Sequence, residues 1–319
     1  MVPAGSRQAL SSLPVPPGSG FGESTLGDAV ESERVRLPDL TTAFARRSAR
    51  LLELAPGHEL EGFLRLIASL VAAQHAALAD LPAGRLPGAA EAAEARQAGR
   101  APLDPAGWKR DPSWQAALTG ILGRIDRAVL PLAGQGACDV LAMASYEDRE
   151  ALAERFLGGH VTEDDIAKMP FVAAALQVAW TRMAALMDVD DMSSSESSEC
   201  PVCGSPPVAG VIAPGGTKFG HRHLHCSLCS TAWRYVRVRC VNCGSTDKIS
   251  FRQLAGTSFL RAECCEVCHG YSKVFYLESA KVLEPLADDL ASLGLDLLVG
   301  EEGFSRVANP FVLAGSRPD

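Results

Sequence analysis

Nine of the ten cysteines in this 319-residue chain lie between residues 200 and 268, and eight of them form four C-x-x-C pairs. Two thiolates separated by two residues can hold one metal ion on a tight turn, and a second such turn completes a tetrahedral four-sulfur site. Four pairs at this spacing predict two such sites. The pairs are Cys200 with Cys203, Cys226 with Cys229, Cys240 with Cys243, and Cys265 with Cys268.

An internal repeat assigns these pairs to two sites. A shift of 40 residues places the first pair on the third, and it also places residues 216–219 (Gly-Thr-Lys-Phe) on residues 256–259 (Gly-Thr-Ser-Phe). With one deletion, the second pair falls on the fourth. An interleaved pairing would break the symmetry of the repeat. The repeat therefore predicts one ion on Cys200, Cys203, Cys226 and Cys229, and another on Cys240, Cys243, Cys265 and Cys268.

The spacing leaves the identity of the metal open, because iron and zinc both accept four thiolates. Zinc would make the sites purely structural, and spacing alone favours zinc. Iron would make them rubredoxin-like and able to carry one electron. A thioredoxin-like disulfide pair fits poorly, since that motif opens a helix in a βαβ unit.

Other candidate residues lie inside and outside this region. His221, His223 and His225 alternate along a predicted strand and so share one side of it; a surface strand is favoured over a supplementary metal site. Cys138 is expected to be a small buried hydrophobic residue. Cys264 lies beside a predicted ligand but outside the pattern, and a packed cysteine is favoured over a spare ligand or reactive thiol.

Residues 218–261 contain eight Lys or Arg and one acid, Asp247, although the chain has a net charge of −8. Trp233, Tyr235, Phe251 and Phe259 are interleaved with these charges. A basic surface with aromatic residues is typical of nucleic-acid binding. An acidic protein partner or a solvated face would suit it equally.

The elements before and after the cysteine pairs must position them. Apolar residues at three- and four-residue steps predict helices over about 40–54, 60–81, 114–129 and 170–187, with shorter helices at 89–97, after Ser145 and after Thr162. Thr162 and Asp165 resemble a capping box. The helical region contains no paired carboxylates, nucleophile elbow or phosphate loop, so no enzyme activity is expected. A further helix is expected to begin near Pro285.

The predicted architecture is an α-helical domain joined to a small β region. We expect a disordered N-terminus at 1–22, an all-α domain at 23–188 and an acidic Ser-rich linker at 189–199. Two tandem rubredoxin-like, or zinc-ribbon-like, units follow at 200–239 and 240–279, with a C-terminal helix and tail at 280–319. The N-terminus lacks the apolar stretch of a signal peptide, and no run of 18 apolar residues indicates a membrane span. Paired cysteines in such a chain favour metal binding in the cytoplasm over a disulfide framework.

The residues together resemble the formate dehydrogenase accessory protein family, FdhE. The resemblance is strongest from Cys200-Pro-Val-Cys-Gly-Ser205 through Leu224-His-Cys-Ser-Leu-Cys229, and it continues in Val236-Arg-Val-Arg-Cys240 and Leu286-Ala-Asp-Asp-Leu-Ala-Ser-Leu293. In the helical part, Phe44-Ala-Arg-Arg-Ser-Ala-Arg-Leu51 is similar too. The aspartates at 288 and 289 match the family, with no role assigned from the sequence.

This resemblance implies a cytoplasmic maturation factor or chaperone, needed for active respiratory formate dehydrogenase and bound to its catalytic subunit. It carries the family's motif cysteines onto the eight paired positions and favours iron over zinc for the two metal ions. The alternative function is a zinc-ribbon nucleic-acid-binding protein with purely structural metal sites.

Overall fold

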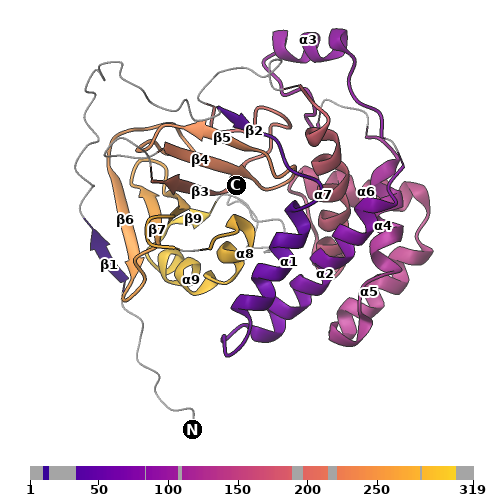
Figure 1. Cartoon of the computed structure of the whole chain (residues 1–319), viewed down its shortest axis with the longest axis horizontal. Coiled ribbons are helices and arrows are strands. Elements are labelled where there is room, and N and C mark those ends of the chain that lie inside the picture. Colours follow the sequence, from indigo (N-terminus) through magenta and orange to yellow (C-terminus); the bar gives the residue numbers. More distant parts are fainter. Residues whose placement is uncertain are drawn as a thin grey trace.

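The structure is a computed structural model, and it describes residues 10–13, 34–82, 84–106, 110–188, 197–214, 221–280 and 282–306. A helical region comes first and a sheet region follows, with two short helices near the end (Figure 1). This order confirms the predicted fold class. The residues 216–219 used to define the repeat lie outside the described part.

The helical region is built around α2 and α7, which pack against each other and against α4. Ser145 caps α6 by accepting a hydrogen bond from the Asp148 amide, and Thr162 and Asp165 form the predicted capping box. Pro170 lies in the first turn of α7, where a missing amide proton costs nothing. The helices are α1 (Ala43–Leu54), α2 (Glu61–Ala79), α3 (Ala89–Gln97), α4 (Ser113–Leu122), α5 (Leu132–Met143), α6 (Tyr146–Leu157) and α7 (Met169–Ala185), with 3-10 turns η1 (Arg127–Val129) and η2 (Glu163–Asp165).

One expectation for this region was wrong, and one helix was missed. The helix predicted over 114–129 ends at Leu122, and Val129 belongs to the separate turn η1. Helix α5 was not predicted, because Leu132, Val140 and Met143 face outward and leave no clear apolar stripe. By length and composition α2 could cross a membrane, but it packs against α1, α4 and α7 as a core helix does.

The two repeat units join into one nine-stranded sheet. In each unit a cysteine pair precedes two antiparallel strands, and the second pair leads into a third strand. The units meet where β8 of the second runs parallel to β3 of the first. The strand order is β1-β6-β7-β8-β3-β4-β5-β2, with β9 also on β8. The central strands are β3 (Pro207–Ala213), β4 (His221–Cys226), β5 (Ala232–Tyr235), β6 (Ile249–Leu254), β7 (Leu260–Cys265) and β8 (Gly270–Tyr276).

Short strands from the N-terminal part cover both edges of this sheet. Strand β1 (Leu10–Leu13) pairs with β6, and β2 (Val35–Arg36) pairs with β5. The prediction of disorder for residues 1–22 therefore fails at Leu10–Leu13. The N-terminal segment has few apolar side chains to bury. The edge strand β6, however, offers free backbone groups, and pairing with them through hydrogen bonds needs no apolar side chains.

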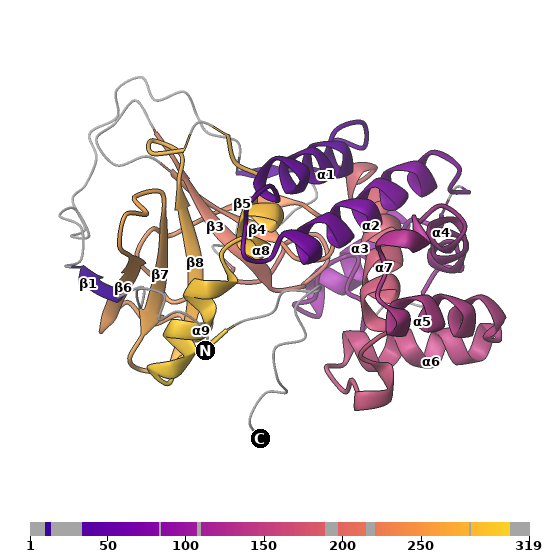
Figure 2. The same cartoon turned by 90° about the horizontal axis from the view of Figure 1, so that it is seen from below.

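The C-terminal segment forms two helices, α8 (Pro285–Leu290) and α9 (Leu293–Glu301), where one was expected, and then strand β9 (Ser305–Arg306). Helix α8 packs against both β3 and α1, and so lies between the sheet and the helical region (Figure 2). A single cluster of buried side chains runs through both regions, from Phe44 and Trp180 to Cys203 and Phe275. The helical region and the sheet therefore share one hydrophobic core.

Candidate metal centres

The first group of four thiols lies fully inside the protein. The sulfur atoms of Cys200, Cys203, Cys226 and Cys229 lie within 4.8 Å of one another, and none of these residues is more than 3% exposed. The Sγ atoms of Cys200 and Cys229 are 3.5 Å apart, and those of Cys203 and Cys226 are 3.4 Å apart. A tetrahedron with metal–sulfur bonds of about 2.3 Å has edges of about 3.8 Å. These separations fit one ion.

The second group has the same arrangement at the protein surface. The sulfur atoms of Cys240, Cys243, Cys265 and Cys268 also lie within 4.8 Å of one another. The nearest pairs are Cys240 with Cys268 at 3.6 Å and Cys243 with Cys265 at 3.7 Å. Cys243 is exposed and Cys268 is half-buried. The two groups therefore differ in access and not in geometry.

All four C-x-x-C turns end in a residue with left-handed backbone conformation. Gly204 and Gly244 follow the first pair of each unit with φ of 70° and 74°. Ser230 and His269 follow the second pairs with φ of 62° and 54°, although neither is glycine. For a residue other than glycine, this conformation costs about 1–3 kcal/mol. The turn around the thiols is thus kept where the sequence lacks glycine.

The first group is also the joint between the sheet and the helical region. Gln177 of α7 donates to the Ser227 carbonyl at 2.7 Å, inside the second turn. The Leu103 amide donates to the Val202 carbonyl at 2.9 Å, inside the first turn, and Trp180 in turn donates to the Leu103 carbonyl. A metal ion at this group would fix both turns against helix α7 and the loop before α4.

The ionisation of the thiols requires a compensating cation. Burial raises the pKa of Cys200 and Cys226 well above the ordinary thiol value. In the second group, the pKa of Cys268 is lowered to about 7. Burial acts to raise it, but hydrogen bonds from the Gly270 amide and the Asn242 side chain to the thiolate outweigh this effect. A metal ion supplies the charge that four neighbouring thiolates need.

The two remaining cysteines belong to neither group. Cys138 is 2% exposed on α5, as the sequence predicted for a small hydrophobic residue. Cys264 is fully buried in the shared core, and burial raises its pKa to about 12. A thiol with this pKa is protonated and unreactive at neutral pH.

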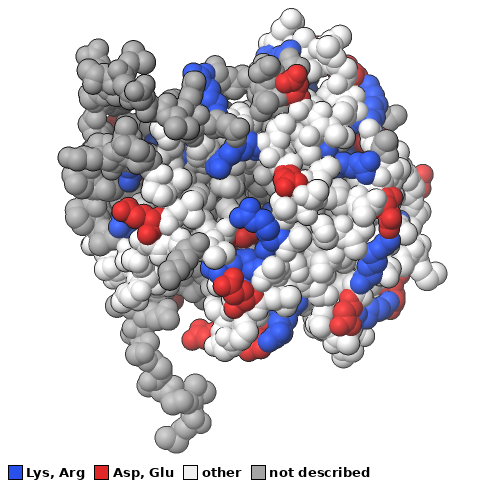
Figure 3. Space-filling model, in the orientation of Figure 1, with Lys and Arg blue, Asp and Glu red and all other residues white. Residues whose placement is uncertain are grey.

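The predicted basic and aromatic surface is largely absent. Trp233, Tyr235 and Phe251 are at most 4% exposed, so none can stack on a base. Arg222 is buried and paired with Glu263 at 2.9 Å. On the described part of the face in Figure 3, Lys and Arg side chains lie beside Asp and Glu side chains. These observations disfavour the nucleic-acid alternative.

The three histidines of β4 alternate with Arg222 and Leu224, but β4 lies between β3 and β5 and is mostly buried, so the predicted surface strand is wrong. Burial, and then the charge of Arg234, lowers the pKa of His221. Burial, followed by the charges of Arg36, His223 and Arg47, lowers the pKa of His225 to about 3. The three imidazoles do not join either group of thiols. Their surroundings are cationic.

Sequence reasoning missed two buried ionic clusters that hold the centres in place. Arg222 of β4 passes over Gly210, which has no side chain to obstruct it, and reaches Glu263 of β7. A Cβ atom at Gly210 would lie 2.8 Å from Arg222 Nε. This contact spans β3 and β8 and ties the first repeat unit to the second.

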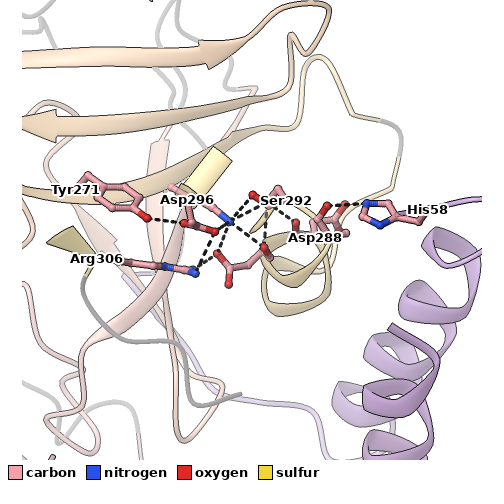
Figure 4. Close-up of polar contacts among 9 residues, drawn as sticks. His58, Tyr271, Asp288, Ser292, Asp296 and Arg306 are labelled. Atoms are coloured by element: carbon pink, nitrogen blue, oxygen red, sulfur yellow. Dashed lines mark hydrogen bonds and ion pairs between the residues drawn. The ribbon is translucent and has the colours of Figure 1, made fainter. Parts of the chain in front are cut away.

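The second cluster gives roles to the aspartates at 288 and 289. Lys273 of β8 is fully buried and donates to the Asp289 carbonyl and to Ser292, while its Nζ lies 2.5 Å from an Asp296 carboxylate oxygen. Figure 4 shows Tyr271 and Arg306 converging on Asp296, and Arg306 also pairs with Asp289.

Asp288 faces the opposite way, toward the helical region. Its carboxylate accepts from Arg50 of α1 through both oxygens and also accepts from the Glu284 amide at the start of α8. His58 contacts the Ala291 carbonyl at 2.9 Å close by (Figure 4). Consecutive aspartates thus attach the same short helix to the sheet and to α1.

Comparisons with known proteins agree with this arrangement. Three family models match in succession: the FdhE N-terminal model over residues 32–196, the FdhE central domain over 199–237 and the FdhE C-terminal domain over 238–313. The chain belongs to the FdhE family. The FdhE C-terminal model includes the second thiol group together with α8 and α9, the elements that the Lys273 cluster joins.

FdhE relatives match along most of their length. A Protein FdhE homolog from Pseudomonas aeruginosa is 38% identical over 278 residues, covering 85% of this chain and 90% of the relative. Protein FdhE from Shigella boydii is 34% identical over 310 residues, covering 95% and 99%. The crystal structure of the FdhE protein from Pseudomonas aeruginosa superimposes with a TM-score of 0.81 at 36% identity, covering 89% of this chain and all of that one.

Proposed function

We propose that this chain is a cytoplasmic accessory protein for the maturation of respiratory formate dehydrogenase, which binds the catalytic subunit of that enzyme. The observation that carries the proposal is the pair of four-cysteine groups within the FdhE fold. Membership of the family suggests formate dehydrogenase as the partner enzyme. The two thiol groups suggest metal binding as the property that the chain brings to it.

The eight paired cysteines are the proposed ligands of two metal ions. The donor set fits, because sulfur separations of 3.4–3.7 Å suit a tetrahedral ion. Iron, which we favour, would supply one-electron chemistry, whereas zinc would supply none. Cys243 and Cys268 lie at the surface and place the second centre where a partner can reach it. The first centre is out of reach of a partner, because its ligands, such as Cys200 and Cys203, are buried.

We further propose that the protein acts by binding and not by catalysing a reaction of its own. The two buried ionic clusters described above are formed by internal ion pairs: Lys273 with Asp289 and Asp296, and Arg222 with Glu263. Buried ion pairs of this kind position elements of the fold and do not face a substrate.

Co-purification tests the proposed partner. A tagged copy of this chain should retain the formate dehydrogenase catalytic subunit from the same cells, and an unrelated subunit of similar size serves as control. The comparison should be made with metal-loaded and metal-free protein. If neither form retains the catalytic subunit, the proposed partner is wrong.

Metal analysis tests the proposed cofactor separately. Protein purified without oxygen should contain two metal ions per chain, with iron at the second centre. Iron bound by four thiolates has a visible absorption that disappears on reduction, and this provides a readout independent of any enzyme. Two zinc ions and no iron would contradict the redox part of the proposal.

A further inference from the structure

The hydrogen bonds to the ligand sulfurs are of two kinds. Backbone amides donate within the turns, and the Leu228 amide lies 3.3 Å from the Cys226 sulfur. In the same way, the Asn242 amide lies 3.3 Å from the Cys240 sulfur. Each bond runs from the second residue after a cysteine back to its sulfur, so the C-x-x-C turn itself provides it. Side-chain donors depend instead on which residues the two repeat units carry.

In the first thiol group, a side-chain hydroxyl meets the last ligand sulfur. Thr231 Oγ1 lies 3.2 Å from the Cys229 sulfur, and Thr231 is fully buried. Thr231 follows Cys229 by two residues, so the hydroxyl and the ligand belong to the same turn. A thiolate that binds a metal ion has no proton to donate, so the hydroxyl is the donor of this bond in the metal-bound protein.

The second thiol group has a side-chain donor at the equivalent sulfur, but this donor comes from the opposite turn. Asn242 lies between Cys240 and Cys243, and its Nδ2 donates to the Cys268 sulfur at 3.5 Å. The repeat places Cys268 on Cys229, the sulfur that the first group holds with a hydroxyl. The Asn242 bond therefore crosses the second group and joins its two turns.

Two differences between the repeat units exchange one donor for the other. The second unit has Gly270 at the position of Thr231, and so lacks the hydroxyl. The first unit has Val202 at the position of Asn242, and so lacks the amide. A Cβ atom at Gly270 would lie 2.8 Å from Asn242 Nδ2 and 3.2 Å from Cys268 Sγ. Glycine therefore gives the Asn242 side chain the space to reach the sulfur.

The two groups also differ in how the rest of the chain supports their turns. In the first group, the Val202 carbonyl accepts from the Leu103 amide. The Ser227 carbonyl accepts from Gln177, so helix α7 and the loop before α4 hold both turns. The second group lies at the surface, where Cys243 is exposed. A hydrogen bond between its two turns restrains them from within the group.

We propose that Asn242 is a positioning residue of the second centre, whose side chain fixes the Cys268 sulfur against the opposite turn and stabilises its negative charge when a metal ion is bound. Thr231 does the same for Cys229 in the first centre, from within one turn. Donors of this kind orient a metal ligand and tune the metal that it binds. The inference rests on the proposed metal binding by the two thiol groups, and it holds whichever metal and partner are natural.

Full-length protein loaded with cobalt(II) tests this role. Cobalt bound by thiolates has a sulfur-to-cobalt charge-transfer absorption, which reports the electron density on the sulfurs. Asn242→Val gives the second unit the residue that the first unit has. We expect the absorption to move to longer wavelength, because Cys268 loses a donor, and a chelator to remove the ion of the second centre about tenfold faster. Thr231→Val should move the absorption in the same direction through the first centre.

Val267→Ala is the matched control. Val267 has the same place in its C-x-x-C turn as Asn242, is 54% exposed and offers no side-chain donor. This variant should keep the absorption and the release rate of the natural chain. Equal absorption and equal release in Asn242→Val and Val267→Ala would overturn the positioning role. Failure of the natural chain to bind cobalt would instead overturn the proposed metal binding, and this inference with it.

Discussion

At the scale of single residues, equivalent cysteines of the two repeats have very different surroundings. Cys203 is fully buried, whereas its counterpart Cys243 is exposed. The spacing that makes them equivalent in sequence says nothing about this difference. Burial decides how easily a competing ligand can reach the bound ion.

A chelator should therefore remove the two metal ions in two phases. The fast phase belongs to the second centre, because Cys243 can be attacked from solvent, and the slow phase requires the core to open. Cys243→Ser should abolish the fast phase and leave about one ion per chain with little change in Tm. Cys203→Ser should abolish the slow phase and lower Tm. Release measured with a coloured chelator checks this, and a single phase for both ions would contradict it.

Gly210 provides a second residue-scale test. Gly210→Ala places a Cβ atom against Arg222 Nε, which is locked in its ion pair with Glu263, and should destabilise the protein by about 1–3 kcal/mol. Gly62→Ala is the control, since nothing lies within 4 Å of that Cβ position in α2. It should stabilise by up to about 1 kcal/mol. Urea unfolding of both variants measures the contrast, and equal midpoints would show that Arg222 can move aside.

At the scale of elements, short segments are held by charged caps more than by their own helix propensity. The turn η2 leads into α7, and its residue Asp165 is nearly fully buried. Arg155, then Thr162 and Lys168, stabilise the carboxylate and hold the pKa of Asp165 well below its usual value of 3.8. The entry into the central helix of the protein thus depends on one ionised carboxylate.

This dependence predicts how Asp165→Asn changes with pH. The folded pKa lies below the unfolded value, so the carboxylate contributes its full stability above about pH 4 and loses it as the pH falls further. Asp165→Asn should cost about 1–3 kcal/mol at pH 7, and the gap to the natural protein should narrow below pH 4. Urea midpoints across this range measure it. The exposed Glu163→Gln serves as control, and a gap that stays constant with pH would contradict the assignment.

At the scale of the whole molecule, the N-terminal strands close a sheet that would otherwise have two free edges. Strand β1 pairs along β6 from Leu254 to Phe251. Unpaired edge strands are templates for association with another chain. Strand β1 therefore protects the sheet as well as extending it.

Removal of residues 1–13 should cause concentration-dependent self-association, because β6 loses its partner. Light scattering after gel filtration, over a range of protein concentrations, measures the mass. Ser12→Ala, which keeps the backbone pairing of β1, should behave as the natural chain does. An unchanged mass for the truncated protein would show that β6 is protected in another way.

Local pattern was sufficient to predict much of the fold. Periodicity predicted most helices, and the boundaries of α3 agree with the predicted 89–97. The grouping of the thiols follows from the repeat, because two turns of one unit lie close together in any ribbon. Capping at Ser145 and Thr162 was visible because such caps are encoded within four residues.

The contacts that place the centres could not be predicted in the same way. The β8–β3 pairing joins strands about 60 residues apart, and no spacing in the sequence marks it. Trp233 and Tyr235 are read as surface residues from their basic neighbours, yet they are buried because the strand alternates sides. The burial of the first thiol group depends on Gln177 and Leu103, which carry no signal of their own.

The parallel joint between the two repeats is a head-to-tail contact, in which the last strand of one unit meets the first strand of the other. A head-to-tail contact can repeat until a ring closes, or continue as a filament, since each added unit presents the same free edge again. The edges left open by the repeats, β6 and β5, are themselves a first and a last strand. Without its two N-terminal strands, this duplicated sheet is the beginning of an open polymer, and β1 and β2 are its terminators.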